Sequence, residues 1–133
     1  MKKVFFILAI VFFTACAAEE NDIIYIGERF FVNEMMEIFF NSDQYLGRTL
    51  QYEGIFSTFI WGDTTTYLVT RNMLGCCSPE EMIGFEVKLG DFRPFEDDAW
   101  VKVTGVLDLD DGFLVIRVTD IAELDERGAE LVF

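Results

Sequence analysis

Short segments in which apolar and polar residues alternate, joined by turns, most limit what this chain can fold into. In residues 100–109, for example, valines alternate with Lys102 and Thr104, which is the period-two pattern of a strand with one buried face. The connections between such segments leave no room for the crossovers that parallel neighbours need. The pattern therefore predicts antiparallel strands.

Five such segments follow one another along the chain, and they span residues 49–56, 65–70, 83–89, 100–109 and 113–121. Gly54 and Gly105 fall inside two of them, where a missing side chain favours a bulge or a tight bend. After a bulge at Gly54, we expect Ile55 to face inward. Five strongly coiled strands predict an all-β fold, a five-stranded OB-like antiparallel barrel. A β-sandwich is the structural alternative.

Shorter elements accompany these strands. Residues 23–31 are compatible with a lead-in strand. Asn33 can cap a short helix that ends near Asn41. Ser78, followed by a proline and two glutamates, is a helix-start signal and predicts about one helical turn before Ile83.

Charge and composition exclude several functions. The 133 residues include 24 Asp or Glu and 10 Lys or Arg, a formal net charge of -14, which argues against a nucleic-acid partner because a phosphate backbone is bound by excess positive charge. The chain has no histidine, which removes the Ser-His-Asp triad and every His-ligated zinc site from consideration. We therefore expect no enzyme and no catalytic residues.

The amino terminus has the pattern of a secretory signal. Two lysines precede an apolar run, Val4–Phe13, and small residues then lead to Cys16. The run is well short of the roughly 20 residues of a membrane-spanning helix. The position of Cys16 is similar to the lipobox of bacterial lipoproteins, in which the cysteine becomes the new, diacylated terminus. An ordinary signal peptide with an incidental cysteine is the alternative.

The lipobox implies a division of the chain and a location. We expect residues 1–15 to be a signal peptide, residues 16–26 a lipidated tether, and residues 27–133 the OB-like β-barrel domain. A lipidated Cys16 would hold the domain in the cell envelope, on the extracytoplasmic face of a bacterial membrane, without spanning it.

Cys76 and Cys77 are the only other thiols in the chain. A disulfide between neighbours is strained, because adjacent Cα atoms lie about 3.8 Å apart and disulfides prefer roughly 4.4–6.8 Å. Gly75 and Ser78-Pro79 imply a turn in which both sulfurs can converge on one ion, and two thiolates suit zinc or copper(I). Glu80 and Glu81 are the nearest carboxylates, and Met73 and Met82 are further ligands for copper(I). The alternative is a structural pair, with one cysteine packed as a small hydrophobe.

Three stretches, 38–54, 71–77 and 100–105, resemble the YcgQ-like group of bacterial proteins. The most specific element is R-x-x-x-x-C-C, which here runs from Arg71 to Cys77. The resemblance implies an OB-like domain that commonly follows transmembrane helices, and a permease partner with a role in metal homeostasis, particularly that of zinc. In this chain a signal with a lipobox replaces those helices.

Three functional hypotheses follow. The first is a non-enzymatic, lipid-anchored binding module that handles zinc through Cys76 and Cys77 or assists a membrane permease. The second is an envelope module that holds a protein or a glycan on the barrel face, as OB folds do for varied polymers. The third is a thiol redox enzyme, which the adjacent spacing disfavours because it lacks the CxxC arrangement that lowers a thiol pKa.

Two other groups of residues have a structural interpretation. Trp61 and Trp100 are expected in the core, in preference to a ligand-stacking surface. Asp108, Asp110 and Asp111 are expected to form a solvated hairpin turn, because they lack the spacing of a calcium loop.

Overall fold

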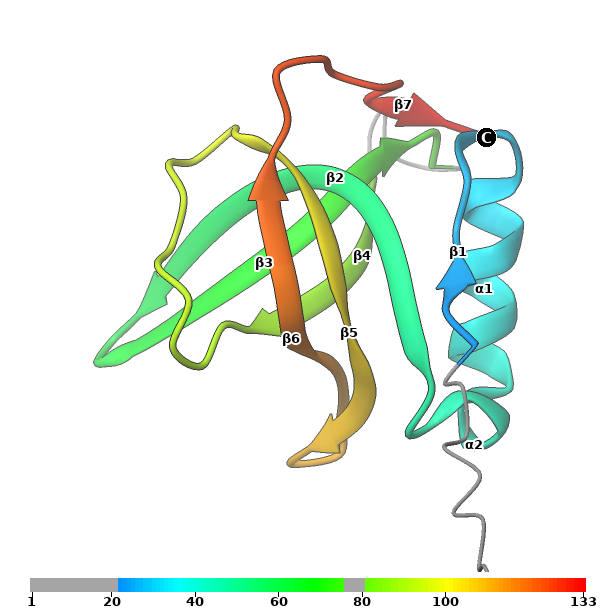
Figure 1. The fold of residues 1–133 in the computed structure, drawn as a ribbon, viewed down its shortest axis with the longest axis horizontal. Helices are drawn as coiled ribbons and strands as arrows, with labels where there is room; N and C mark the ends of the chain where they lie inside the picture. The colour runs from blue at the N-terminus through cyan, green and yellow to red at the C-terminus, as the bar shows by residue number, and fades with distance from the viewer. Residues whose placement is uncertain (1–21, 76–80) are drawn as a thin grey trace, which may run out of the picture.

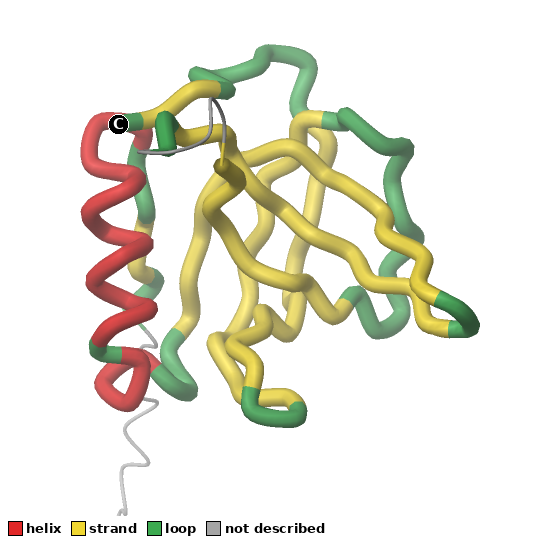
Figure 2. The backbone as a smooth tube through the Cα atoms, turned by 180° about the vertical axis from the view of Figure 1, so that it is seen from behind, coloured by secondary structure: helices red, strands yellow, loops and turns green. Residues whose placement is uncertain are grey.

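The computed structural model describes residues 22–75 and 81–133, which form a β-barrel with a helix across one of its ends (Figures 1 and 2). The elements are β1 (Ile24–Tyr25), the 3-10 helix η1 (Glu28–Phe30), α1 (Phe31–Phe40), α2 (Ser42–Tyr45), β2 (Thr49–Trp61), β3 (Thr64–Met73), β4 (Glu81–Lys88), β5 (Trp100–Asp110), β6 (Phe113–Glu123) and β7 (Leu131–Val132). The predicted all-β, OB-like barrel is confirmed.

The barrel closes because β2 is long enough to pair with two neighbours. Residues 49–55 of β2 pair with β5, and residues 55–61 pair with β3. Gly54 lies just before this change of partner, where a Cβ would stand 2.8 Å from the carbonyl oxygen of Thr70. The pairing with β5 is continuous through Gly54, so the bulge predicted there is absent. Phe56, and not Ile55, is therefore the buried side chain.

One barrel pairing is parallel, although the sequence suggested antiparallel neighbours. Strands β4 and β6 run parallel through residues 86–88 and 115–117, and the order β2-β5-β6-β4-β3 returns to β2. A parallel pair needs a crossover, and here the 89–99 loop and β5 together provide it. A strand of the barrel itself thus serves as part of the crossover, and no separate crossover segment is needed.

The bulge predicted at Gly105 is confirmed. The register between β5 and β6 shifts between Thr104 and Gly105. A Cβ at Gly105 would come into contact with the backbone carbonyl of Arg117 and lie 2.5 Å from the Cγ2 atom of Ile116. Glycine is therefore required here by the close approach of β6.

Helix α1 lies across one end of the barrel (Figure 1). Its buried residues, Phe31, Met35 and Ile38, have the i, i+4, i+7 spacing of one helix face. The helix begins at Phe31, directly after η1, so Asn33 lies in its first turn and is not the predicted cap. Its end at Phe40 agrees with the prediction.

The ends of two expected segments also differ. Ile24 and Tyr25 pair with β2, and Ile26 is buried, so these residues belong to the fold and not to a free tether. The helical turn expected before Ile83 falls partly outside the described residues, but Glu81 and Met82 are already in β4. Within residues 22–75 and 81–133, no helix combines the length and the apolar character that crossing a bilayer requires.

Tyr52 joins three strands inside the barrel. Its hydroxyl donates a hydrogen bond to the carbonyl oxygen of Val69 in β3 (2.8 Å) and accepts one from the backbone N–H of Phe85 in β4 (3.2 Å). The ring contacts Phe31 of α1 edge-on, with 5.9 Å between centroids. Burial raises the pKa of Tyr52 well above its ordinary value.

Tyr52→Phe is expected to lower the free energy of unfolding by about 1–2 kcal/mol at pH 8, because two buried backbone groups lose their partner. Wild type should also lose stability above about pH 10, by up to about 1.4 kcal/mol per pH unit, because Tyr52 ionises only in the unfolded chain. The contribution is complete below the unfolded pKa and is lost as the pH rises. Urea unfolding at pH 8 and pH 11 measures both effects.

The matched control is Tyr67→Phe, which removes a hydroxyl from a partly exposed tyrosine whose ring stacks on Phe56. We expect a smaller loss of stability than in Tyr52→Phe at pH 8. A loss of stability above pH 10 that is as steep in Tyr52→Phe as in wild type would contradict the assignment to Tyr52.

Candidate functional site

The predicted ligands lie mostly outside the described residues. Cys16, Cys76, Cys77 and Glu80 all fall there. The structure does describe the strand ends on either side of the cysteine pair. Strand β3 ends at Met73 and β4 begins at Glu81, so the pair lies in the connection between two antiparallel strands.

The flanking residues divide between the two faces of this hairpin. Met73 and Glu81 are directly opposite each other in the register, so their side chains share one face. Met82 is the next residue along β4 and therefore points to the other face, where it is 57% exposed. Of the flanking side chains predicted as ligands, Met73 and Glu81 are brought together and Met82 is separated from them.

The side chain of Glu81 lies against Gly75. Its carboxylate lies so close to Gly75 that a Cβ on that glycine would be 2.8 Å from both the Cδ and an oxygen of Glu81. Gly75 directly precedes Cys76. Glu81 thus lies against the residue that leads into the cysteine pair.

The arginine of the R-x-x-x-x-C-C element lies inside the barrel, near the end of β3 that leads to the cysteine pair. Arg71 is two residues before Met73 on the inward row of β3, and it is 1% exposed. Its Nε donates to the carbonyl oxygen of Glu53 (2.7 Å), and its Nη1 donates to the carbonyl oxygen of Ala129 (3.2 Å) and to Oε1 of Glu28 (3.4 Å). One side chain therefore joins β2, β3, η1 and the carboxy-terminal segment.

Two aromatic rings enclose the Arg71 guanidinium. Its Cζ lies 4.7 Å from the ring centroid of Phe31 and 4.9 Å from that of Trp100, within the range of cation–π attraction. Burial lowers the pKa of Arg71, and the carboxylates of Glu28 and Glu53 oppose that effect. We expect Arg71 to be charged at neutral pH, because arginine starts from a very high pKa. Its role is to hold the barrel end together.

The carboxy-terminal segment closes over Arg71. The backbone N–H of Ala129 donates to Oε1 of Glu28 (2.8 Å), and the N–H of Asn72 donates to the carbonyl oxygen of Glu130 (2.9 Å). Strand β7 then pairs in parallel with the last two residues of β3, placing Val132 opposite Met73. The strand that leads into the cysteine pair is therefore fixed on both sides.

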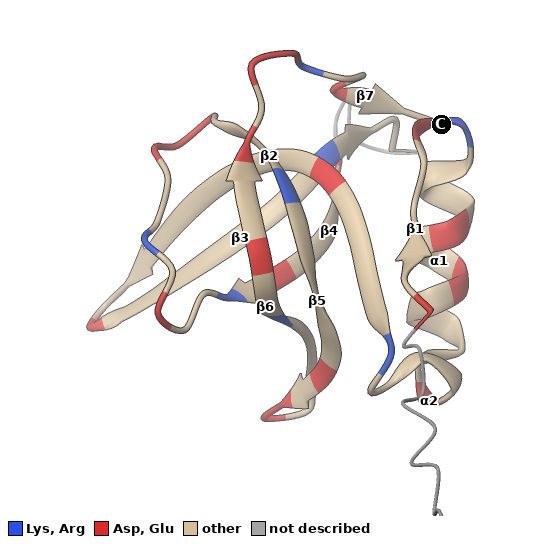
Figure 3. Cartoon of the chain, viewed as in Figure 1, with Lys and Arg blue, Asp and Glu red and all other residues tan. Residues whose placement is uncertain are grey.

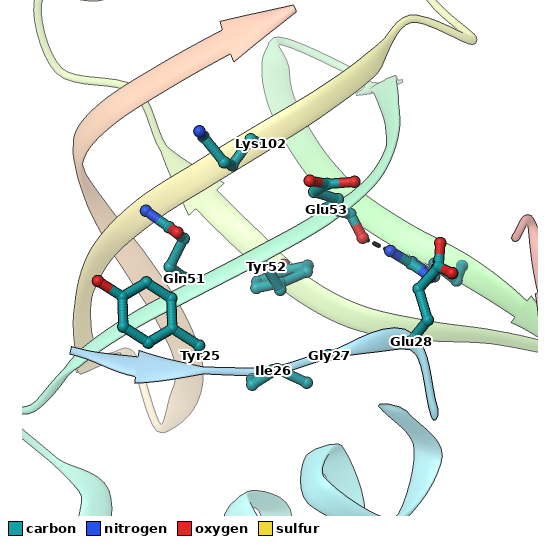
Figure 4. Close-up of a pocket in the computed structure, with 9 residues that line it drawn as sticks. Tyr25, Ile26, Gly27, Glu28, Gln51, Tyr52, Glu53 and Lys102 are labelled. Carbon is teal, nitrogen blue, oxygen red and sulfur yellow. Dashed lines mark hydrogen bonds and ion pairs between the residues drawn. The ribbon is translucent and has the colours of Figure 1, made fainter. Parts of the chain in front are cut away.

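A pocket of about 300 Å³ opens beside this cluster (Figure 4). Tyr25, Gln51 and Lys102 line it together with Glu28 and Glu53. Glu28 is bound by Arg71 and Ala129, and the Glu53 carboxylate accepts a hydrogen bond from the Trp100 indole (3.2 Å). Both carboxylates are thus engaged in internal contacts. We therefore assign these pocket residues a structural role, which is to hold this end of the barrel together.

Comparison with known families covers nearly the whole chain. The family described as the DUF1980 C-terminal domain matches residues 14–133. The chain belongs to the DUF1980 family. No curated protein matches it. The resemblance seen in the sequence is thus supported at the level of the domain family.

OB folds often bind ligands on the face formed by the second and third barrel strands and the adjoining turns. In this DUF1980 domain those two strands are β3 and β4. A pocket of about 260 Å³ lies there, between Tyr67 of β3 and Phe92 of the following loop. Its cation, Lys88, pairs with Glu86 (2.5 Å) and Asp110 (2.9 Å), which raise its pKa. The pocket therefore has an aromatic wall, formed by Tyr67 and Phe92, and a lysine whose charge is balanced by two carboxylates.

The acidic hairpin between β5 and β6 forms a turn, as expected. Asp108 pairs with Arg117, and Asp110 pairs with Lys88. Asp111 has a positive φ of 49° at the turn. Among the described residues, no three His, Cys, Asp or Glu side chains are grouped as a metal site.

The two tryptophans occupy opposite environments. Trp100 is 2% exposed and packs on Arg71, which confirms its predicted place in the core. Trp61 is 89% exposed at the tip of the β2–β3 hairpin, so the core prediction is wrong for this residue. The role of Arg71 was also missed by sequence reasoning. The sequence does carry a signal for it, because Arg71 is a single cation among the alternate, inward-facing residues of β3, which are Tyr67, Val69 and Met73.

Proposed function

We propose that this DUF1980 domain is a lipid-anchored, extracytoplasmic and non-enzymatic module that holds zinc through Cys76 and Cys77. The observation that carries the proposal is the register of β3 and β4, which places Glu81 opposite Met73 and against Gly75, beside the cysteine pair. Two thiolates and a carboxylate are ligands that zinc accepts. A permease that receives or delivers the ion is the partner we propose.

The contacts that hold this end of the barrel together support the same proposal. Ligands bind an ion well when the elements that carry them are already held in place. Arg71 ties β3 to β2 and to Ala129, and β7 covers the last residues of β3. The chain thus enters the cysteine pair from a fixed strand.

Anchoring and zinc binding can be tested separately in the full chain expressed in a bacterium that processes lipoproteins. Wild type is expected in the membrane fraction and should carry near one equivalent of zinc per chain when purified without chelator. Cys76→Ser/Cys77→Ser should remain in the membrane and lose the zinc, because the thiolates supply the binding. Cell fractionation, elemental analysis and intact mass measure these outcomes.

Cys16→Ser is the matched control, since it also removes a thiol. It should lack the mass of the lipid and keep its zinc. A double variant that retains zinc would refute the metal proposal. A Cys16→Ser chain that keeps a wild-type lipid mass would refute the anchor, and a wild-type mass two hydrogens light would indicate a Cys76–Cys77 disulfide.

A second candidate function rests on the pocket between Tyr67 and Phe92. An aromatic wall beside the hydroxyl of Thr65 suits a neutral polar ligand such as a glycan better than a polyanion. Wild-type chain without zinc or any other metal would favour this envelope-interaction function.

A further inference from the structure

The β2–β3 hairpin ends in three consecutive large apolar side chains. Phe59 is 47% exposed, Ile60 is 74% exposed and Trp61 is 89% exposed. The hairpin projects from the barrel on the side opposite α1 (Figure 1). From this geometry we propose that the tip, Phe59–Trp61, is a membrane-docking element that enters the interfacial region of a lipid bilayer.

Charge is absent from almost the whole hairpin. Between Glu53 and Arg71 the only charged residue is Asp63, whereas 26% of the chain is charged and about four charges would be expected in a stretch of this length. Figure 3 shows the hairpin without charge apart from its very tip. An acidic chain is repelled by anionic headgroups, so this hairpin, whose only charge is Asp63, meets less of that repulsion than the acidic remainder of the chain.

Both faces of the tip are apolar, and this feature favours lipid over a protein partner. Successive residues of a strand point to opposite faces, so Phe59 and Trp61 share one face and Ile60 lies on the other. The opposing strand supplies uncharged threonines, with Thr64 opposite Trp61 and Thr66 opposite Phe59. A protein partner packed on the hairpin would cover one face, whereas a lipid interface surrounds both.

The chemistry of the tip suits the bilayer interface. Tryptophan is enriched at the membrane–water boundary, because its large ring is apolar and its indole N–H can still reach water. Trp61 is at the last position of β2, next to the turn. The inference rests on the proposed envelope location only in that a bilayer must be within reach.

The test uses the emission of Trp61. The chain has two tryptophans, and Trp100 is buried. The chain from residue 16 onward, which contains every described residue, carries an amino-terminal hexahistidine tag and is held by a nickel-chelating lipid on phosphatidylcholine vesicles, made with or without brominated acyl chains. Brominated lipid is expected to quench at least about half of the emission that Trp61→Phe removes, because the indole lies at acyl-chain contact distance.

Two variants complete the experiment. Trp61→Phe should show no quenching beyond that of Trp100, and Phe59→Ser/Ile60→Ser should reduce the quenching of Trp61 at least twofold. Equal emission of wild type on the two kinds of vesicle would overturn the proposal and leave a protein partner for the tip. The tag supplies the attachment, so this failure is distinct from a failure of Cys16 lipidation.

Discussion

Replacing Arg71 with methionine is expected to lower the free energy of unfolding by about 4 kcal/mol. Methionine fills part of the same volume, but it leaves the carbonyl oxygens of Glu53 and Ala129 without their donor. It also removes the cation that Phe31 and Trp100 enclose. Because Arg71 joins four chain segments, its loss should loosen the barrel end as a unit.

Urea unfolding followed by circular dichroism measures this loss. Arg71→Lys separates charge from shape, because lysine keeps the charge and lacks the planar fork of donors. We expect Arg71→Lys to be destabilised by about 2 kcal/mol, between the wild type and Arg71→Met.

Arg117→Met is the matched control, since it removes a surface arginine whose side chain is 52% exposed and paired with Asp108. An ion pair exposed to solvent in this way contributes little to stability. A loss in Arg71→Met no larger than that in Arg117→Met would show that Arg71 does not hold the barrel end.

The strands were predictable because period-two alternation is a local property. It identified all five barrel strands, although β2 continues five residues beyond its predicted end at residue 56, and Gly105 was correctly assigned as a bulge. The continuous pairing at Gly54 could not be read in the same way, because the need for glycine comes from the approach of Thr70, a residue on the neighbouring strand. Identical local signals thus reflect different tertiary causes.

The site was predictable only in part, for a similar reason. The motif containing Arg71 was visible, but its role depends on Glu28 and Ala129, which are distant in sequence and meet only in the fold. Trp61 was expected in the core because tryptophan is large and apolar. Its exposure depends instead on how far β2 extends beyond the barrel. The pairing of Met73 with Glu81 likewise required the register.

Gly105→Val tests whether the bulge is a requirement of the barrel. A valine Cβ would meet the backbone of Arg117 and the side chain of Ile116, and backbone cannot move aside as a flexible side chain can. Overpacking of this kind costs about 3 kcal/mol or more, so we expect a melting temperature at least about 12 °C below that of wild type.

The matched control is Gly27→Ala, because a Cβ at Gly27 would have no atom within 4 Å. Its φ of -88° is open to any residue, so alanine should be neutral or stabilise the fold by a few tenths of a kcal/mol through the unfolded chain. If Gly105→Val melted within a few degrees of Gly27→Ala, β5 and β6 would be able to separate locally at Gly105. The barrel would then owe its closure to the pairing of β2 with both neighbours and not to the coiling of β5 at the bulge.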